Sequence, residues 1–385
     1  MEQFDKHTMP LRVNSLDILK GAIMVLMAVD HVRVYSGIPS NSFEPAFFFT
    51  RWITHFCAPG FAFLAGTSAF LYGQRVNDKK KLSGFLLTRG LFLILLEITV
   101  IRFFWTFNFN YSNFFLAGVI WMLGWCMVIM ALLTKLKPLA VGIVGLIIIA
   151  SQQAFKFLPK VVPNSLHVSF GKFWEFIYPS GLQGIEGVTI LYVIVPWIGV
   201  MAAGYGFGLI LLMEKEKRNK LCRIIGISAI TVFLIAGSLL ANSKPTTNES
   251  PAFIFRLLNQ NKYPASQLYL LMTLGPIIAL IPFAEKARGW LFNILSVFGR
   301  VPLFYYLLYI PLIHLSALVV MYLSEGVISF DLYSTAPFTF LPEENRWSLP
   351  LLYFVFFINV IMLFFLCKWY SKFKKKYPYG ILKFF

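Results

Sequence analysis

The sequence predicts an all-α polytopic membrane protein, a bundle of about ten transmembrane helices that forms a single domain over residues 1–385 and keeps both termini in the cytoplasm. Composition is the first reason, because 58% of the residues are apolar and only 13% are charged, whereas soluble domains carry roughly 25% charged residues. The second reason is a series of long apolar runs. The third is the regular alternation of basic and less basic loops between them.

Ten apolar runs are long enough to cross a bilayer, for which about 18 residues suffice. They cover residues 15–36, 51–74, 82–105, 113–134, 138–156, 187–213, 221–241, 267–285, 301–323 and 349–371. Residues 289–299 have the pattern of a short amphipathic helix lying on the cytoplasmic surface. We see no internal repeat in the sequence, which disfavours a transporter built from inverted repeats.

The charge of the loops sets the orientation. Lys and Arg gather in the short loops after the second, fourth, sixth and eighth runs and in the carboxyl-terminal tail, which places those loops and both termini inside. The intervening loops are longer and poorer in basic residues: 37–50, 106–112, 157–186, 242–266 and 324–348. The net charge of +17 therefore indicates topology and attraction to anionic lipid rather than nucleic-acid binding.

Several classes of protein are disfavoured by what the sequence lacks. We expect no removable signal peptide, because the first apolar run is too long and starts too late. The cysteines lie in or beside apolar runs, so we expect neither a disulfide framework nor a cysteine metal site; they are Cys57, Cys126, Cys222 and Cys367. The chain has no P-loop, GxSxG or HExxH motif, and we expect no metal cofactor.

Charged and histidine side chains inside the predicted spans are the strongest functional signal. Such groups are costly in hydrocarbon, so they usually face a bundle interior and mark a pathway or a reaction site. At 1.5 Å per helical residue, His31 lies roughly 24 Å above the inner end of its span and His55 about 6 Å below the outer end of its own. Glu97, Arg102 and His314 lie at roughly 22, 30 and 20 Å from the inner ends. The residues expected in the outer half of the bilayer are Asp30, His31, Arg51, His55, Glu97, Arg102 and His314.

A structural role competes with a functional one at each of these positions. A lone intramembrane His is commonly a hydrogen-bonded core residue. Arg51 and Arg102 can snorkel to the interface, and Glu97 can form an ion pair with either. Their shared depth nevertheless favours a reaction site. His31 is the best candidate for a general base, because a nearby carboxylate, Asp30, suits it to proton transfer.

Two groups of residues lie at the expected cytoplasmic end. Lys20 shares a helix face with Asp17, which helix capping and an ion pair explain. Arg300 and Pro302 open the ninth run and precede Tyr306 and its neighbouring tyrosines. That pattern suits a phosphate-bearing ligand entering from the cytoplasm, and an interfacial aromatic belt explains it equally well. The candidates for binding such a ligand are Arg300, Tyr306 and Lys20.

Five segments of the chain resemble a known family. The first helix resembles the signature of the heparan-α-glucosaminide N-acetyltransferase family in RVNSLDILKGAIMVLMAVDHVR. The second resembles the bacterial members of that family in FFFTRWITHFCAPGFAFLAGTSAFLYG. Three later segments resemble the same members: LYVIVPWIGVMAAGYGFG, KYPASQLYLLMTLGP and FGRVPLFYYLLYIPLIH. The match to the bacterial members spreads over nearly the whole chain, whereas the link to the lysosomal enzyme rests mostly on the first two helices.

The resemblance implies a polytopic acyltransferase of the bacterial inner membrane. Members of the family take acetyl from cytoplasmic acetyl-CoA and deliver it to an amino sugar on the far side, where a histidine assists the transfer. In the lysosomal enzyme an Asn falls where His31 falls, and the catalytic His follows in the next segment. Here residues 32–50 contain no His. The role is therefore left to His31 or His55, or the chemistry differs, and a heparan acceptor does not follow from the resemblance.

The leading interpretation is an acyl-CoA-dependent O- or N-acyltransferase that moves acetyl from acetyl-CoA to an amine or hydroxyl of an extracytoplasmic sugar or glycan. His31 would be the general base, with His55 as its alternative or partner, and Asp30 and Glu97 would tune or orient them. Arg51 would hold the acceptor or the oxyanion. Further candidates for acceptor binding are Glu97, Arg102 and His314.

Two other functions stay open. One is a proton-coupled transporter of a small metabolite or envelope precursor, in which the same cluster would act as a proton relay. The other is a membrane subunit with no enzymatic activity. The oligomeric state is open as well, with a homodimer as one option.

Overall fold

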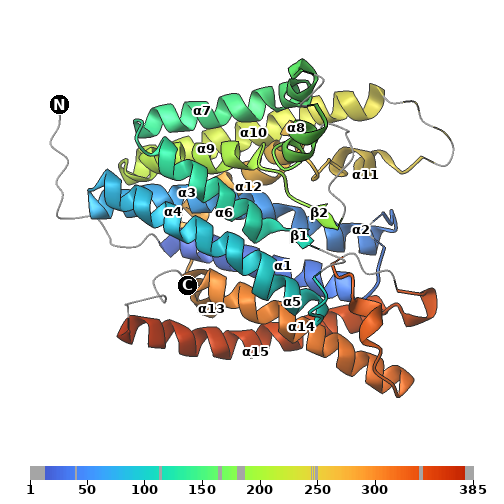
Figure 1. Cartoon of the computed structure of the whole chain (residues 1–385). Helices are drawn as coiled ribbons and strands as arrows, with labels where there is room; N and C mark the ends of the chain where they lie inside the picture. Colours follow the sequence, from blue (N-terminus) through green and yellow to red (C-terminus); the bar gives the residue numbers. More distant parts are fainter. Residues whose placement is uncertain are drawn as a thin grey trace.

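The computed structural model describes residues 14–377 apart from 40, 112–114, 164–166, 180–186, 244, 246, 248–249 and 338–340. In this part the molecule is a bundle of helices that run side by side in both directions (Figure 1). Helix α1 (Asn14–Tyr35) begins, and α15 (Leu349–Lys376) ends, at the same end of the bundle. We call it the basic end, because residues 79–81 and the last turn of α15 place lysines there. This is the end that the sequence predicts to be cytoplasmic.

The opposite end, called the loop end, carries short helices and connecting segments (Figure 1). Its short elements are α2 (Pro45–Trp52), η4 (Leu158–Val161), α8 (His167–Trp174), α11 (Phe253–Leu258), η5 (Phe330–Tyr333) and η6 (Glu343–Asn345).

Seven helices in the described part are long and apolar enough to cross a membrane. Four are single helices: α10 (Lys215–Ser243), α12 (Gln267–Lys286), α14 (Pro302–Glu325) and α15. Three are composite: α2 with η1 (Ile53–Phe56) and α3 (Cys57–Val76); α4 (Lys79–Leu96) with η2 (Glu97–Ile101) and α5 (Arg102–Thr106); and α7 (Pro138–Ser151) with η3 (Gln152–Lys156). The chain is thus mostly helical and polytopic, as predicted, while the count of ten and the orientation stay predictions.

The other three predicted runs look different. Helix α1 has 22 residues but carries Asp17, Lys20, Asp30 and Arg33 along its length. Helices α6 (Val119–Leu133) and α9 (Trp197–Leu211) have only 15 residues each, fewer than the runs 113–134 and 187–213. Near the starts of these runs the chain forms strands instead, and β1 (Phe115–Ala117) and β2 (Val188–Ile190) pair in parallel. Pairing satisfies backbone groups that an unpaired extended segment would leave open in an apolar environment.

Local sequence signals fix several helix ends. Asp78 accepts hydrogen bonds from the backbone amides of Lys80 and Lys81 at 2.8 and 3.1 Å, which caps the start of α4. Asn77 just before it takes a left-handed conformation with φ of 51° and ends α3. Ser266 caps α12 by accepting from the amide of Tyr269 at 3.1 Å.

Glycines let helices approach closely. A Cβ added to Gly66 of α3 would lie 1.9 Å from the carbonyl oxygen of Met201 in α9, and one on Gly299 would lie 1.8 Å from that of Asp17. Gly299 belongs to α13 (Trp290–Arg300), the amphipathic helix expected at the cytoplasmic surface. One face of α13 packs against the first half of α1, while Trp290 stays exposed. The four cysteines are buried, and none forms a disulfide.

Candidate functional site

His31 lies on α1 between two aromatic side chains from distant parts of the sequence. Its ring stacks on Tyr309 of α14, with centroids 5.0 Å apart and 24° between the planes. It also packs against Trp105 of α5 at 4.5 Å. The Tyr309 hydroxyl hydrogen-bonds to Nδ1 of the imidazole. Tyr309 itself is fully buried, so it holds the His31 ring in one orientation.

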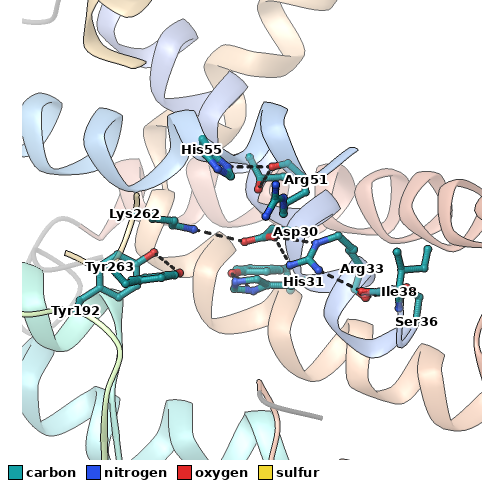
Figure 2. Close-up of polar contacts among 12 residues, drawn as sticks. Asp30, His31, Arg33, Ser36, Ile38, Arg51, His55, Tyr192, Lys262 and Tyr263 are labelled. Carbon is teal, nitrogen blue, oxygen red and sulfur yellow. Dashed lines mark hydrogen bonds and ion pairs between the residues drawn. The ribbon is translucent and has the colours of Figure 1, made fainter. Parts of the chain in front are cut away.

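The neighbouring Asp30 carboxylate contacts two cations. Arg33 donates to Oδ1 from Nη2 at 3.0 Å and from Nε at 3.3 Å. The ammonium of Lys262, which lies in the segment between α11 and α12, is 3.9 Å from Oδ2 (Figure 2). These side chains are only 11–18% exposed, so the charges interact with little screening by water.

His55 lies in η1, on the other side of Asp30 from His31 (Figure 2). Its Nδ1 is 3.2 Å from the carbonyl oxygen of Arg51. Its ring packs on Tyr269, and the Tyr269 hydroxyl donates to the His55 carbonyl at 2.7 Å. Asp30 is an electrostatic neighbour of both imidazoles.

Arg51 and Lys262 complete this group. Arg51 donates from Nη2 to Oδ1 of Asn259 at 3.0 Å and lies over the ring of Phe48. Lys262 lies over the ring of Tyr263 at 5.2 Å. We call the group Asp30, Arg33, Arg51, His55 and Lys262 the outer cluster.

Lys262 remains charged at neutral pH despite its burial. Burial alone would lower the pKa of its ammonium, but Tyr192 and the Asp30 carboxylate outweigh that effect and raise the pKa above the ordinary lysine value. The segment that carries Lys262 is outside the apolar runs, so the sequence does not mark it as an intramembrane charge.

Two other candidates from the sequence, Glu97 and Arg102, make contacts of their own. The Glu97 carboxylate accepts from the amides of Ile120 and Trp121 at 2.9 and 3.1 Å and so caps α6. Arg102 donates to Thr106 Oγ1 at 3.0 Å and to the carbonyls of the loop that follows α5. Both side chains are 1% exposed, and these contacts give them a structural role. A role in acceptor binding stays a prediction for each.

His314 occupies a neighbouring aromatic group. It is fully buried, its ring stacks on Phe107 at 4.0 Å, and Nδ1 is 3.2 Å from the carbonyl of Phe104. Tyr35 lies between this group and the His31 site, because its ring stacks on Trp105 at 5.8 Å and lies 4.9 Å from the His314 ring. From their shared depth we expect His314 to share one polar cavity with Asp30, His31 and His55, and this stays a prediction.

A cavity of about 710 Å³ lies on the basic-end side of His31. Its apolar wall includes Met24 and Met27 of α1, and its basic residues are Lys20, Arg75, Arg89, Arg300 and Lys374. The three residues that the sequence marked for a phosphate-bearing ligand, Lys20, Arg300 and Tyr306, all line it. Lys20 donates to Ser68 Oγ at 2.7 Å on its wall.

Two tyrosines, Tyr306 and Tyr309, connect the wall of this cavity to His31. Tyr306 lines the cavity about one turn into α14, and its ring centroid is 5.4 Å from that of Tyr309. Tyr309 in turn hydrogen-bonds to His31. Met27, on the cavity wall, precedes His31 by one turn of α1. A ligand that fills the cavity would therefore end next to the His31 site.

The structure adds residues that the sequence did not single out. Arg89 lies inside the predicted span 82–105, so the cost of an intramembrane charge was a usable signal for it. Its Nε is buried without a hydrogen-bond partner among the described residues. Arg33 and Trp105 join the site through contacts that only the fold reveals. Within the described ranges, His, Cys, Asp and Glu side chains form no group of three that could hold a metal ion.

Comparison with known proteins gives one family. Residues 12–241, which include α1 to α9 and most of α10, match the model of the catalytic region of heparan-alpha-glucosaminide N-acetyltransferase. A search of curated proteins gave no match.

Proposed function

Because the chain belongs to the heparan-alpha-glucosaminide N-acetyltransferase family, we propose that it transfers acetyl from cytoplasmic acetyl-CoA to an amine or hydroxyl of an extracytoplasmic sugar or glycan. One observation carries the proposal: the cavity with basic residues in its wall ends at Tyr306, next to the Tyr309–His31 pair. The outer cluster lies beside His31 (Figure 2). A donor in the cavity and an acceptor at the outer cluster would therefore both be next to this histidine.

The chemistry of the cavity suits coenzyme A. Its volume of about 710 Å³ is within the usual range for ligand pockets, roughly 300–1,000 Å³. The phosphates of the donor would bind Arg300, Lys20 and Arg75, and the pantetheine arm would follow the apolar wall. The thioester would then lie beside Tyr306.

His31 is proposed as the general base. The acceptor amine or hydroxyl attacks the thioester carbonyl, and His31 takes the proton that the acceptor loses. When the tetrahedral intermediate collapses, the carbon–sulfur bond breaks and the imidazolium returns a proton to the coenzyme A thiolate. Tyr309 keeps the imidazole in place through both steps.

His31 is favoured over His55 because it is the imidazole joined to the donor cavity. His55 faces the outer cluster, and its Nδ1 is engaged with the Arg51 carbonyl. We propose that His55 and Arg51 act on the acceptor.

The experiment is thiol release by the purified protein. Acetyl-CoA is supplied with glucosamine or with a neutral polyol as acceptor, and free coenzyme A is measured together with the acetylated product. Acceptor-dependent thiol release supports the proposal. Proton-gradient-dependent uptake of a solute by reconstituted vesicles, with no thiol release, would support the transporter instead.

A further inference from the structure

A second cavity, of about 360 Å³, lies at the loop end of the bundle, beside α11 (Figure 1). Its wall is formed by the end of α10, by α11, by residues 259–261 and by the start of α12. The described residues that line it include none of the outer cluster and none of the donor cavity. We call it the loop-end pocket. Its volume is within the usual range for ligand pockets, roughly 300–1,000 Å³.

Amide side chains supply most of the polar groups of the loop-end pocket. The Gln260 amide nitrogen donates to the carbonyl of Leu257 at 2.8 Å, and that of Gln267 donates to the carbonyl of Ile149 at 3.3 Å. These bonds use the amide nitrogens, so the side-chain oxygens of Gln260 and Gln267 stay available as hydrogen-bond acceptors. The amides that line the pocket are Gln153, Asn259, Gln260, Asn261 and Gln267.

Of the described residues that line the pocket, Arg256 alone is charged. Its Nη1 donates to the carbonyl of Ala241 at 2.9 Å, and its Nε is buried without a hydrogen-bond partner among the described residues. The pocket thus offers donors and acceptors together. A hydroxyl group can donate and accept at once, whereas a phosphate or carboxylate only accepts and would be repelled by the oxygens of Gln260 and Gln267. This favours a neutral ligand that is rich in hydroxyl groups.

The rest of the wall is apolar. Phe43, Leu240 and Leu268 line it, and the Phe43 ring is 38% exposed. An apolar wall with a few placed polar groups is typical of small-molecule sites. An aromatic ring also gives a flat apolar face, on which the C–H face of a sugar ring can pack.

We propose that the loop-end pocket is a second saccharide site, which holds a neutral sugar unit. Asn259 lines the pocket and accepts from Arg51 of the outer cluster at 3.0 Å, so this unit would lie next to the outer cluster. It is either joined to the sugar that reacts or part of a separate saccharide. Only its link to the acceptor rests on the proposed transferase function, because binding in the pocket needs no transfer.

Binding without acetyl-CoA tests the site. The purified full-length protein is kept in a polyoxyethylene detergent, whose head group contains no sugar, and is titrated with cellobiose, maltose and diacetylchitobiose. Saturation-transfer NMR measures the binding. We expect at least one disaccharide to bind with a Kd of about 1 mM or lower. Because the ligand is neutral, high salt should leave the Kd unchanged, and inorganic phosphate should not compete.

Matched variants locate the binding. Gln260→Ala, Gln153→Ala and Phe43→Ala should each weaken it about tenfold. The Gln153 side chain is exposed, so its replacement leaves the core intact. Gln74→Ala is the control, because Gln74 is an exposed amide near the basic end of α3. His31→Ala should also bind the disaccharide normally. Gel filtration and thermal unfolding check that each variant folds.

Thiol-release kinetics identify the source of the sugar unit. If the unit is joined to the reacting sugar, a disaccharide of glucosamine and glucose should have a KM about tenfold below that of glucosamine, and Gln260→Ala should remove the difference. Equal KM values for the two acceptors, with normal binding of the neutral disaccharide, indicate a separate saccharide in the same site.

Three results would overturn the saccharide site: no binding of any of the three disaccharides, binding that survives all three pocket substitutions in folded protein, or displacement by inorganic phosphate. Thiol release that continues in any of these cases leaves the transferase function standing without this site. Normal disaccharide binding without any thiol release would instead refute the transferase alone.

Discussion

At the scale of single residues, the contact between His31 and Tyr309 joins the donor cavity to the proposed base. Tyr309→Phe removes the hydroxyl and keeps the ring. We expect turnover to fall about tenfold and the pH profile of kcat/KM to shift, because the imidazole loses the partner that orients it. Steady-state kinetics over a range of pH measures both. Tyr353→Phe is the matched control, since it removes a hydroxyl bonded to Thr50 instead. An unchanged profile in Tyr309→Phe would leave the tyrosine as packing only.

Substitution of His31 and substitution of His55 should affect different kinetic constants. His31→Ala is expected to lower kcat by about 10²–10⁴-fold with little loss of folded protein, the usual size of a general-base contribution. His55→Ala should mainly raise the KM for the acceptor, because it removes binding on the acceptor side. If His55→Ala abolishes turnover while His31→Ala is mild, the two roles are exchanged. If neither matters in folded protein, the cluster is structural.

Residues of the donor cavity should affect acetyl-CoA alone. Arg300→Gln and Arg89→Gln are each expected to raise the KM for acetyl-CoA about tenfold while the KM for the acceptor stays the same. Arg288→Gln is the control, because Arg288 is exposed at the basic end and is not among the cavity-lining residues. A similar rise in all three variants would indicate loss of general surface charge and not of a donor site.

At the scale of elements, the first turn of α6 is capped by the carboxylate of Glu97, which lies before α5 in the sequence. Glu97 lies in the π-helical turn between α4 and α5 and caps α6, and a Cβ on Gly118 would lie 2.4 Å from Glu97 Oε1. The first turn of α6 supplies Val119 and Ile120 to the cavity wall, so the cap also shapes the donor site.

Removing this cap should destabilise the protein. Glu97→Ala leaves two buried amides without their acceptor, which costs about 1–3 kcal/mol for each such group. We expect a lower temperature of thermal unfolding in detergent, followed by fluorescence, and a smaller loss for Glu97→Gln, which keeps one acceptor oxygen. Should Glu97→Ala unfold like the unaltered protein and fail only in catalysis, the acceptor-binding role expected from the sequence would be favoured over the capping role.

The length of the apolar runs predicted the seven long helices of the described part, because a membrane demands about 18 or more apolar residues and leaves few alternatives. This length did not predict β1 and β2. Residues 113–134 and 187–213 are as apolar as the true helices, and the parallel pairing of Phe115 with Val188 joins segments 73 positions apart. No local signal could reveal that pairing.

At the scale of the whole molecule, the orientation follows from the basic loops and is open to labelling. All four cysteines can be replaced, and single cysteines introduced at Lys80 and at Lys172 in intact cells. An impermeant maleimide should label position 172, in the 157–186 loop, and spare position 80. A cysteine at position 248, in the 242–266 loop, should be labelled in the same way; Asn248 lies outside the described residues. Labelling of position 80 from outside would overturn the orientation and place the donor cavity on the wrong side for acetyl-CoA.

The site was only partly predictable at this scale. Depth along the helices selected Asp30, His31 and His55, and the fold places both histidines near the Asp30 carboxylate (Figure 2). Depth alone could not distinguish these residues from Glu97 and Arg102. The structure shows that Glu97 caps α6 and that Arg102 donates to carbonyls of the loop after α5. Lys262 could not be found in this way, because it reaches Asp30 from a segment 232 residues later.

Transfer across the membrane is the central claim, and a sided assay tests it most directly. The protein is reconstituted into sealed vesicles with labelled acetyl-CoA outside and an amino sugar acceptor trapped inside. In the molecules whose basic end faces outward, we expect coenzyme A to be released outside and the acetylated sugar to appear inside. His31→Ala should abolish both signals. Acetylated sugar formed only on the side that holds acetyl-CoA, or no thiol release with any acceptor, would contradict the account.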